Sequence, residues 1–138
     1  MKVLFVCTAN ACRSQMAEAW ARHLFPAGWT AASAGLLTHP IHERTRAIMA
    51  EAGVTMDGQY SKPIDSVDLD AFDLVVTLSL EAGRFLPALA DPGRHRRCPM
   101  TDPMSARGSP EEIRAAYRAG RDHLKRLVCE LVSELSRP

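Results

Sequence analysis

Residues 3–14 read Val3-Leu4-Phe5-Val6-Cys7-Thr8-Ala9-Asn10-Ala11-Cys12-Arg13-Ser14. The first four residues form an apolar run typical of a buried strand, and a helical pattern of apolar residues begins directly after Ser14. A loop that joins a strand to a helix N-terminus turns backbone N–H groups inward, beside the positive end of the helix dipole. The stretch therefore predicts a strand, an anion-binding loop and a helix, in that order.

This loop also carries a thiol and a permanent positive charge, at Cys7 and Arg13. Inward N–H groups and the Arg13 guanidinium would stabilise Cys7 as a thiolate, which is the reactive form of cysteine. Arg13 would bind two oxygens of a tetrahedral anion, and Ser14 would donate a hydrogen bond to the thiolate. Cys12 either packs beneath the loop or pairs reversibly with Cys7 under oxidation. The anion would be held by the loop residues Thr8, Ala9, Asn10, Ala11, Cys12 and Arg13.

Predicted strands and helices alternate along the rest of the chain. The strands cover Lys2–Val6, Trp29–Ser33 and Leu74–Leu78. The helices run from Met16 to about Phe25, from Pro40 to a stop at Gly53, over Glu81–Leu89, and from an N-cap at Ser109 to the end of the chain. This order predicts one α/β domain over residues 1–138, with a twisted parallel sheet of about four strands and helices on both faces. Ligands bind at the carboxyl ends of the strands in such sheets, where the loop after the first strand would lie.

Composition excludes several classes of function. The chain has 138 residues, 46% of them hydrophobic, with a net charge of +1 and dispersed basic residues. This pattern predicts neither a nucleic-acid-binding stripe nor a polybasic membrane anchor, and the run Arg94-His95-Arg96-Arg97 is expected to be a solvated loop. No apolar stretch approaches the ~20 residues of a membrane span, and a strand begins where a signal peptide would stand. We therefore expect a protein of the reducing cytoplasm.

The four cysteines favour redox or nucleophilic use over a disulfide scaffold. No Cys-x2-Cys spacing occurs, and His39 and His42 have no acidic or thiol partner at ligand spacing, so no metal site is predicted. Cys129 lies beside the apolar stripe of the last helix and is expected in or near the core.

Thiol attack on an oxyanion ester leaves an oxygen that needs a proton, so a carboxylic acid should face the loop. Asp91-Pro92 and Asp102-Pro103 are the two candidates. Asp and Pro also favour ordinary turns, and spacing does not choose between the two pairs.

The sequence resembles the low-molecular-weight phosphotyrosine phosphatase superfamily, and within it the arsenate reductases that share the phosphatase fold. The resemblance rests on the Cys7–Ser14 loop, Gln15-Met16-Ala17-Glu18, Ser33-Ala34-Gly35, Asp73–Leu78, Asp102-Pro103 and Arg107–Glu112. It implies that Cys7 attacks arsenic, that Asp102 is the general acid, and that Asp91 is a turn residue. It also implies that a thiol then attacks the Cys7 adduct and that the resulting disulfide releases arsenite.

The thiol relay departs from the family pattern. Thioredoxin-coupled relatives carry two further cysteines at positions that correspond here to Ser79 and Leu86. Cys98 would be a substitute resolving thiol. Alternatively, glutathione or mycothiol, with a glutaredoxin-like partner, would attack the adduct directly, and we favour this route over Cys98 and over a Cys7–Cys12 pair. No tightly bound cofactor is expected, because the thiol reductant is a co-substrate.

Four other residues match positions that organise the loop in relatives: Asn10, Glu18, Ser33 and Lys62. Some relatives hold a monovalent cation there, and the Lys62 ammonium would replace it.

Two rival functions share these residues. A phosphotyrosine phosphatase would use the same nucleophile, arginine and acid, but phosphotyrosine-specific relatives place aromatic residues beside the acid, where this chain has Thr101, Pro103 and Met104. A non-catalytic oxyanion sensor would be expected to lose one of the three residues, and all three are present. The sequence therefore favours an arsenate reductase.

Overall fold

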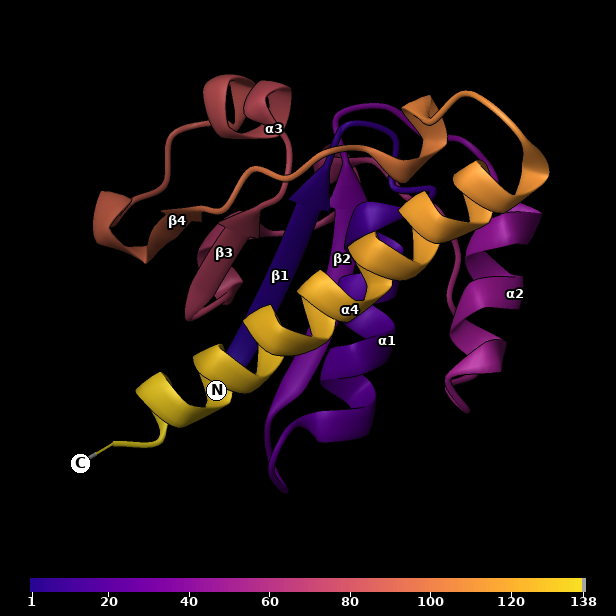
Figure 1. Ribbon diagram of the computed structural model, residues 1–138. Helices are drawn as coiled ribbons and strands as arrows, with labels where there is room; N and C mark the ends of the chain where they lie inside the picture. Colours follow the sequence, from indigo (N-terminus) through magenta and orange to yellow (C-terminus); the bar gives the residue numbers. More distant parts are fainter. Residues whose placement is uncertain (138) are drawn as a thin grey trace.

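The computed structural model describes residues 1–137. Their four strands form one parallel sheet in the order β2-β1-β3-β4 (Figure 1). The strands are β1 (Lys2–Cys7), β2 (Thr30–Gly35), β3 (Leu74–Thr77) and β4 (His95–Arg97). The central strands β1 and β3 are apolar and almost entirely buried, as strands covered on both faces must be. The predicted parallel α/β architecture is confirmed.

Helices cover the two faces of the sheet unequally. The helices are α1 (Arg13–Leu24), α2 (Glu43–Glu51), α3 (Leu80–Phe85) and α4 (Pro110–Leu135), with short 3-10 turns at Ile64–Ser66, Leu69–Ala71, Pro92–Arg94 and Pro103–Ser105. Side chains of α1, α2 and α4 pack with Val3 and Phe5 in the larger core cluster. The opposite face, with Leu4 and Val6, is covered by α3 and by the segments around the 3-10 turns.

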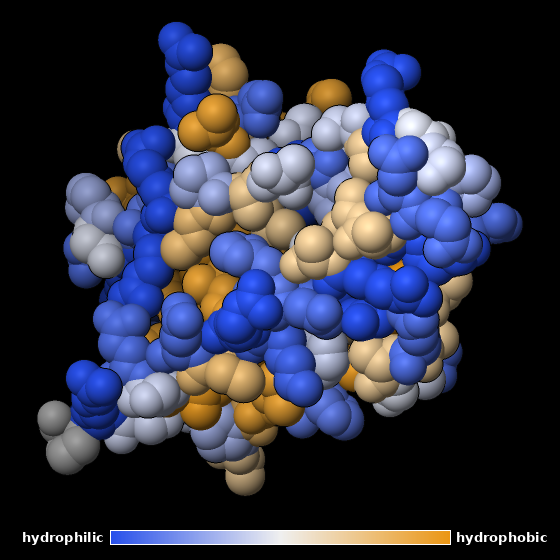
Figure 2. Space-filling model, viewed as in Figure 1, coloured by the Kyte–Doolittle hydropathy of each residue, from blue (hydrophilic) through white to orange (hydrophobic). Residues whose placement is uncertain are grey.

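The surface over α4 is mostly hydrophilic, with apolar atoms showing in small patches (Figure 2). The predicted N-cap of this helix is confirmed, because Ser109 and Glu112 form a complete capping box. Among residues 1–137, no helix is both long enough and apolar enough to cross a membrane.

The prediction for Cys129 was wrong, because this residue is exposed. Its neighbour Val128 is buried, and successive side chains on an α-helix are rotated by about 100°. Cys129 therefore falls just outside the buried stripe.

Four elements also differ from the expectations. The run Arg94–Arg97 is not a loop: three of its residues form β4, because an edge strand pairs through its backbone and tolerates charged side chains. The second helix starts at Glu43 rather than at Pro40, since the His42 ring accepts a hydrogen bond from the Arg44 N–H and caps the helix there. Elsewhere β2 extends through Gly35, and α3 ends at Phe85 rather than Leu89.

An ion-pair cluster joins α2 to α4. The Glu51 carboxylate accepts hydrogen bonds from Arg118 Nε at 2.9 Å and from Arg121 Nη1 at 2.8 Å. Hydrogen bonds from Arg118 and then Arg121 lower the pKa of Glu51 from 4.5 to about 2. Because the folded state holds this proton more weakly than the unfolded chain, the stabilisation is complete above about pH 4.5 and disappears as the pH falls toward 2.

We expect Glu51→Gln to lower the urea midpoint of unfolding at pH 7, by an amount that shrinks steadily as the pH is lowered from 4.5 toward 2. Urea titrations at several pH values, followed by circular dichroism, measure this difference. Glu111→Gln is the matched control, because Glu111 pairs with Arg114 within the same helix and links no two elements. If the difference in urea midpoint between Glu51→Gln and the wild type stays constant with pH, the lowered pKa of Glu51 is contradicted.

Candidate active site

The predicted anion-binding loop lies at the carboxyl end of the sheet, between the tip of β1 and the start of α1 (Figure 1). Cys7 is the last residue of β1 and is only 2% exposed. Its Sγ lies 2.8 Å from Ser14 Oγ in the first turn of α1. The structure thus brings together the thiol and the hydroxyl that the sequence predicts to support it.

The end of β2 shapes the loop from one side. Leu36 and Leu37 donate backbone hydrogen bonds to the carbonyls of Cys7 and Thr8, at 3.2 and 2.8 Å. A Cβ on Gly35 would lie 2.7 Å from the Asn10 nitrogen, so only glycine allows this approach.

Of the two Asp-Pro candidates, Asp102 is the one that the structure brings to the loop. Its Oδ2 lies 3.5 Å from Arg13 Nη2, while its Oδ1 accepts the Met104 N–H at 2.9 Å and so caps the turn Pro103–Ser105. Arg13 Nη1 also donates to the Met100 carbonyl at 3.2 Å, which ties the segment before Asp102 to the loop. Asp102 Oδ1 therefore holds the turn, and Asp102 Oδ2 faces Arg13.

Asp91 occupies a similar turn elsewhere. It caps the 3-10 turn Pro92–Arg94, its Oδ2 lies 3.7 Å from Arg94 Nε, and its side chain is 62% exposed. None of its contacts within residues 1–137 reaches the loop. The geometry therefore selects Asp102 over Asp91.

A buried polar network supports the loop from below. Asn10 adopts a left-handed backbone conformation, with φ at 51°, and its Nδ2 donates to Ser14 Oγ at 2.7 Å and to Ser33 Oγ at 3.0 Å. Ser33 Oγ in turn donates to Glu18 Oε1 at 2.7 Å. Three of the four predicted supporting residues are thus joined in one chain of hydrogen bonds that ends at Cys7.

The fourth supporting residue, Lys62, lies at the far end of this chain. Its ammonium is 3.9 Å from Glu18 Oε1, and Arg22 is 2.9 Å from Glu18 Oε2. Burial lowers the pKa of Lys62, with the Glu18 carboxylate acting in the opposite direction. The Lys62 ammonium therefore lies beside the buried Glu18 carboxylate. This is the place where the resemblance implies that the ammonium replaces a monovalent cation.

The sequence reasoning missed two glutamines in this network. Gln15 donates to the Asn10 carbonyl at 3.1 Å, and Gln59 donates to Gln15 Oε1 at 2.9 Å. Gln15 directly precedes Met16, where the apolar helical pattern begins, and a polar amide at that position is a usable signal because a buried amide needs hydrogen-bond partners. No local signal marks Gln59, because its partner lies 44 residues away.

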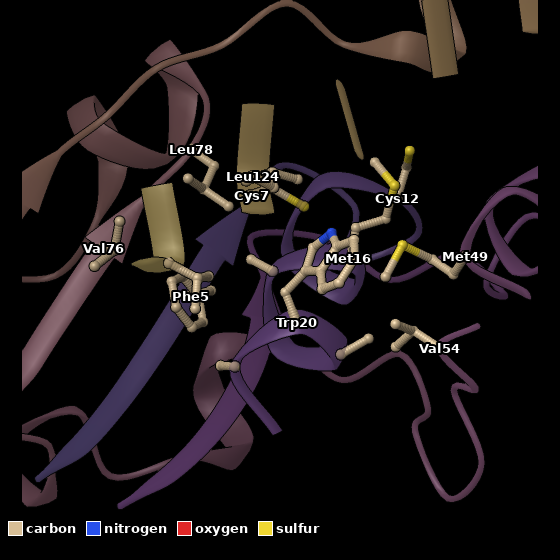
Figure 3. Close-up of a cluster of buried hydrophobic side chains, with 14 of the residues drawn as sticks. Phe5, Cys7, Cys12, Met16, Trp20, Met49, Val54, Val76, Leu78 and Leu124 are labelled. Carbon is tan, nitrogen blue, oxygen red and sulfur yellow. The ribbon is translucent and has the colours of Figure 1, made fainter. Parts of the chain in front are cut away.

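All four cysteines are free thiols. Figure 3 shows Cys7 at the tip of β1 and Cys12 on the side where Met16 and Met49 lie. Burial raises the pKa of the Cys12 thiol to about 12, which leaves it a poor nucleophile. Cys12 thus takes the packed position beneath the loop that was one of its two expected placements.

Cys98 is half-buried and packs against the core cluster that contains Cys7 and Cys12. Burial raises the pKa of its thiol; Arg96 opposes the shift, and Glu130 and Glu134, in the second half of α4, add to it. Ser79, at one family thiol position, caps α3 and accepts a hydrogen bond from Thr8 Oγ1 at 3.0 Å. The thiols of Cys12 and Cys98 therefore both have raised pKa values, which disfavours the thiolate form that would attack Cys7.

A hollow of about 750 Å³ adjoins Asp102, between α4 and residues 99–106. Its walls include Leu80, Met100, Ala116 and His123, and no aromatic Phe, Tyr or Trp from residues 1–137 lines it. The surroundings of the acid thus lack the rings that would grip a phosphotyrosine.

The chain is similar to known proteins over most of its length. The chain is 36% identical over 122 residues to an arsenate reductase of Bacillus subtilis, covering 88% of both chains. A solved arsenate reductase in its phosphate-binding state is 31% identical, with a TM-score of 0.80 and 98% of each chain covered. A low molecular weight protein tyrosine phosphatase of T. tengcongensis has the same fold, with a TM-score of 0.80 at 24% identity over 97% of this chain and 99% of that one.

The shared fold therefore extends over nearly the whole molecule. A family model described as low molecular weight phosphotyrosine protein phosphatase matches residues 2–137, so the chain belongs to that family.

Proposed function

We propose that the protein is an arsenate reductase, with Cys7 as nucleophile, Arg13 as the oxyanion-binding fork and Asp102 as proton donor. The observation that carries the proposal is the pairing of Asp102 with Arg13, in the loop that follows Cys7, in a chain whose similar relatives are named arsenate reductases. Two of these relatives are 35–36% identical over 88–91% of the chain. The phosphate-bound state of a similar structure supports a tetrahedral oxyanion as the ligand of the loop.

In the first step, the Cys7 thiolate attacks arsenic and a sulfur–arsenic bond forms. Backbone N–H groups of residues 8–13 and the Arg13 guanidinium stabilise the charge on the arsenate oxygens. Asp102 Oδ2, beside Arg13, donates a proton to the departing oxygen, which leaves as water. Ser14 stabilises the thiolate before the attack.

In the second step, an external thiolate attacks Cys7 Sγ and a disulfide forms. The sulfur–arsenic bond breaks, its electron pair stays on arsenic, and As(V) becomes As(III), which leaves as arsenite. A second thiol then reduces the mixed disulfide, so two thiols supply the two electrons. The reaction needs a reduced thiol pool, which is the physical reason to place it in the cytoplasm.

We assign the external thiol to glutathione or mycothiol, with a glutaredoxin-like protein as the reductase of the mixed disulfide. Two observations support this assignment. The thiols of Cys12 and Cys98 have raised pKa values, and the family relay positions hold Ser79 and Leu86 instead of cysteines. Thioredoxin acting through Cys98 is the competing route.

Cys98→Ser separates the two routes. We expect the variant to retain wild-type arsenate-dependent NADPH oxidation, within about twofold, when a small thiol and its redoxin system are supplied, because Cys98 forms no bond in the cycle. Cys129→Ser is the matched control, since Cys129 is also a free thiol and lies exposed on α4. Loss of turnover in Cys98→Ser alone would instead assign the resolving thiol to Cys98.

Phosphoester hydrolysis is the second candidate, because phosphate and arsenate have nearly the same shape and charge and the family includes phosphatases. Hydrolysis of an aryl phosphate, measured beside NADPH oxidation, tests it. Brisk hydrolysis without arsenate-dependent oxidation with any thiol donor would overturn the reductase proposal.

A further inference from the structure

Three side-chain amides form a buried chain from residue 59 to the nucleophile loop. Gln59 Nε2 lies 3.0 Å from the backbone carbonyl of Gln15 and 2.9 Å from Gln15 Oε1. A carbonyl oxygen only accepts hydrogen bonds, so Gln59 must present its NH2 group to Gln15. The side-chain oxygen of Gln15 is thereby held toward Gln59.

The opposite end of Gln15 faces the loop. Gln15 Nε2 lies 3.1 Å from the carbonyls of both Asn10 and Tyr60, and 2.9 Å from Asn10 Oδ1. The two carbonyls again demand a donor, so the orientation of Gln15 is set by backbone carbonyls at its Nε2 end and by the Gln59 NH2 group at its Oε1 end. The side chain of Gln15 is fully buried.

Gln15 and the backbone of Lys62 together set which way the Asn10 amide points. Asn10 Oδ1 accepts from Gln15 Nε2 and from the Lys62 backbone N–H, the latter at 2.9 Å. Asn10 Nδ2 must then face Ser14 and Ser33, to which it donates. Because Ser14 Oγ accepts from Asn10, its own proton is left for Cys7 Sγ, 2.8 Å away.

We propose that Gln15 and Gln59 are positioning residues, which fix the direction of the Ser14 hydroxyl so that it donates to Cys7 Sγ. The inference rests on the proposed function, in which Cys7 reacts as a thiolate. A reversed Asn10 amide would offer its oxygen to Ser14, and the hydroxyl proton would turn away from the sulfur. The glutamines therefore act on the nucleophile through two intervening side chains, without contacting substrate.

This role predicts a specific kinetic pattern. The Arg13 guanidinium and the loop N–H groups, which bind the anion, are not part of the amide chain. Removing a glutamine amide should therefore lower kcat for arsenate by about tenfold and leave KM within about twofold, since a lost charge-assisted hydrogen bond is worth roughly a factor of ten in the thiolate population.

The test uses the full chain carrying Cys98→Ser and Cys129→Ser, which leaves the two loop thiols, both 2% exposed. Burial raises the pKa of Cys12 to about 12, so Cys12 stays protonated at pH 6 and alkylation there reports on Cys7. Gln15→Met and Gln59→Met keep the side-chain length and remove the amide. We expect iodoacetamide to alkylate Cys7 about tenfold more slowly at pH 6 in these variants and at the wild-type rate near pH 10, which lies above the ordinary pKa of a cysteine thiol. Gln59→Glu, which keeps the shape of glutamine and removes its donors, serves the same comparison if a methionine variant does not fold.

Trp20→Phe is the matched control, because it removes a buried hydrogen bond, from Trp20 Nε1 to the Arg121 carbonyl, outside the network. An unchanged pH profile of alkylation in the glutamine variants, together with a loss of stability like that of Trp20→Phe, would overturn the positioning role and leave the proposed function intact. Slow alkylation of Cys7 at pH 6 in the background chain itself would overturn both.

Discussion

Replacing Cys7 by serine is expected to abolish arsenate-dependent NADPH oxidation, with a loss of at least ~10⁴-fold in kcat. A serine hydroxyl stays protonated at neutral pH, so the strong nucleophile disappears. The second step fails as well, since oxygen cannot form the disulfide that carries the two electrons to arsenic. Both chemical steps of the proposed cycle depend on this one sulfur.

Binding of the anion should survive in the same variant. The loop N–H groups and Arg13 are unchanged in Cys7→Ser, so the variant should bind phosphate or arsenate with an affinity close to that of the wild type in calorimetric titration. Cys129→Ser, tested in parallel, should retain full turnover because this thiol is exposed on α4. Substantial turnover by Cys7→Ser would remove the basis of the mechanism.

Replacing Asp102 by asparagine is expected to lower turnover by ~10²–10⁴-fold, the usual contribution of a positioned general acid. The change is conservative in structure, because an asparagine oxygen can still accept the Met104 N–H and cap the turn Pro103–Ser105. What is lost is the transferable proton beside Arg13. The variant should therefore have a lower kcat, while its urea midpoint of unfolding stays close to that of the wild type.

Asp91→Asn is the matched control, since Asp91 caps a similar Asp-Pro turn and lies outside the loop. A series of aryl phosphates with increasingly poor leaving groups adds a second measurement, in which the defect of Asp102→Asn should grow as the leaving group becomes more basic. An equal loss for good and poor leaving groups would show that Asp102 does not donate the proton.

Much of the fold was predictable from local patterns in the chain. Apolar runs identified the central strands β1 and β3, and the capping box at Ser109 identified the start of α4. These signals are strong because burial on two faces and the geometry of a helix N-terminus each constrain consecutive residues. The edge strand β4 carries no such signal, because its pairing uses the backbone and its side chains remain charged.

Part of the site was predictable for a similar reason. The loop from Cys7 to Ser14 joins a strand to a helix, so its residues are close in space because they are close in sequence. The other parts of the site come from distant segments, and their placement depends on how those segments pack.

The amino-acid sequence alone was enough to predict a parallel α/β protein, and it indicated a nucleophilic thiol in an oxyanion-binding loop. Spacing left Asp91 and Asp102 equivalent, since both precede proline in a turn, and only the family resemblance favoured Asp102; the sequence gave no sign of Gln59. Tertiary packing distinguished the two acids by bringing Asp102 to 3.5 Å from Arg13 and placing Asp91 beside Arg94, and it brought Gln59 against Gln15. The physical reason is the separation along the chain. Burial periodicity and helix capping act between residues a few positions apart, so they can be recognised in the sequence. These contacts instead join residues tens of positions apart, which the sheet and helices between them bring together.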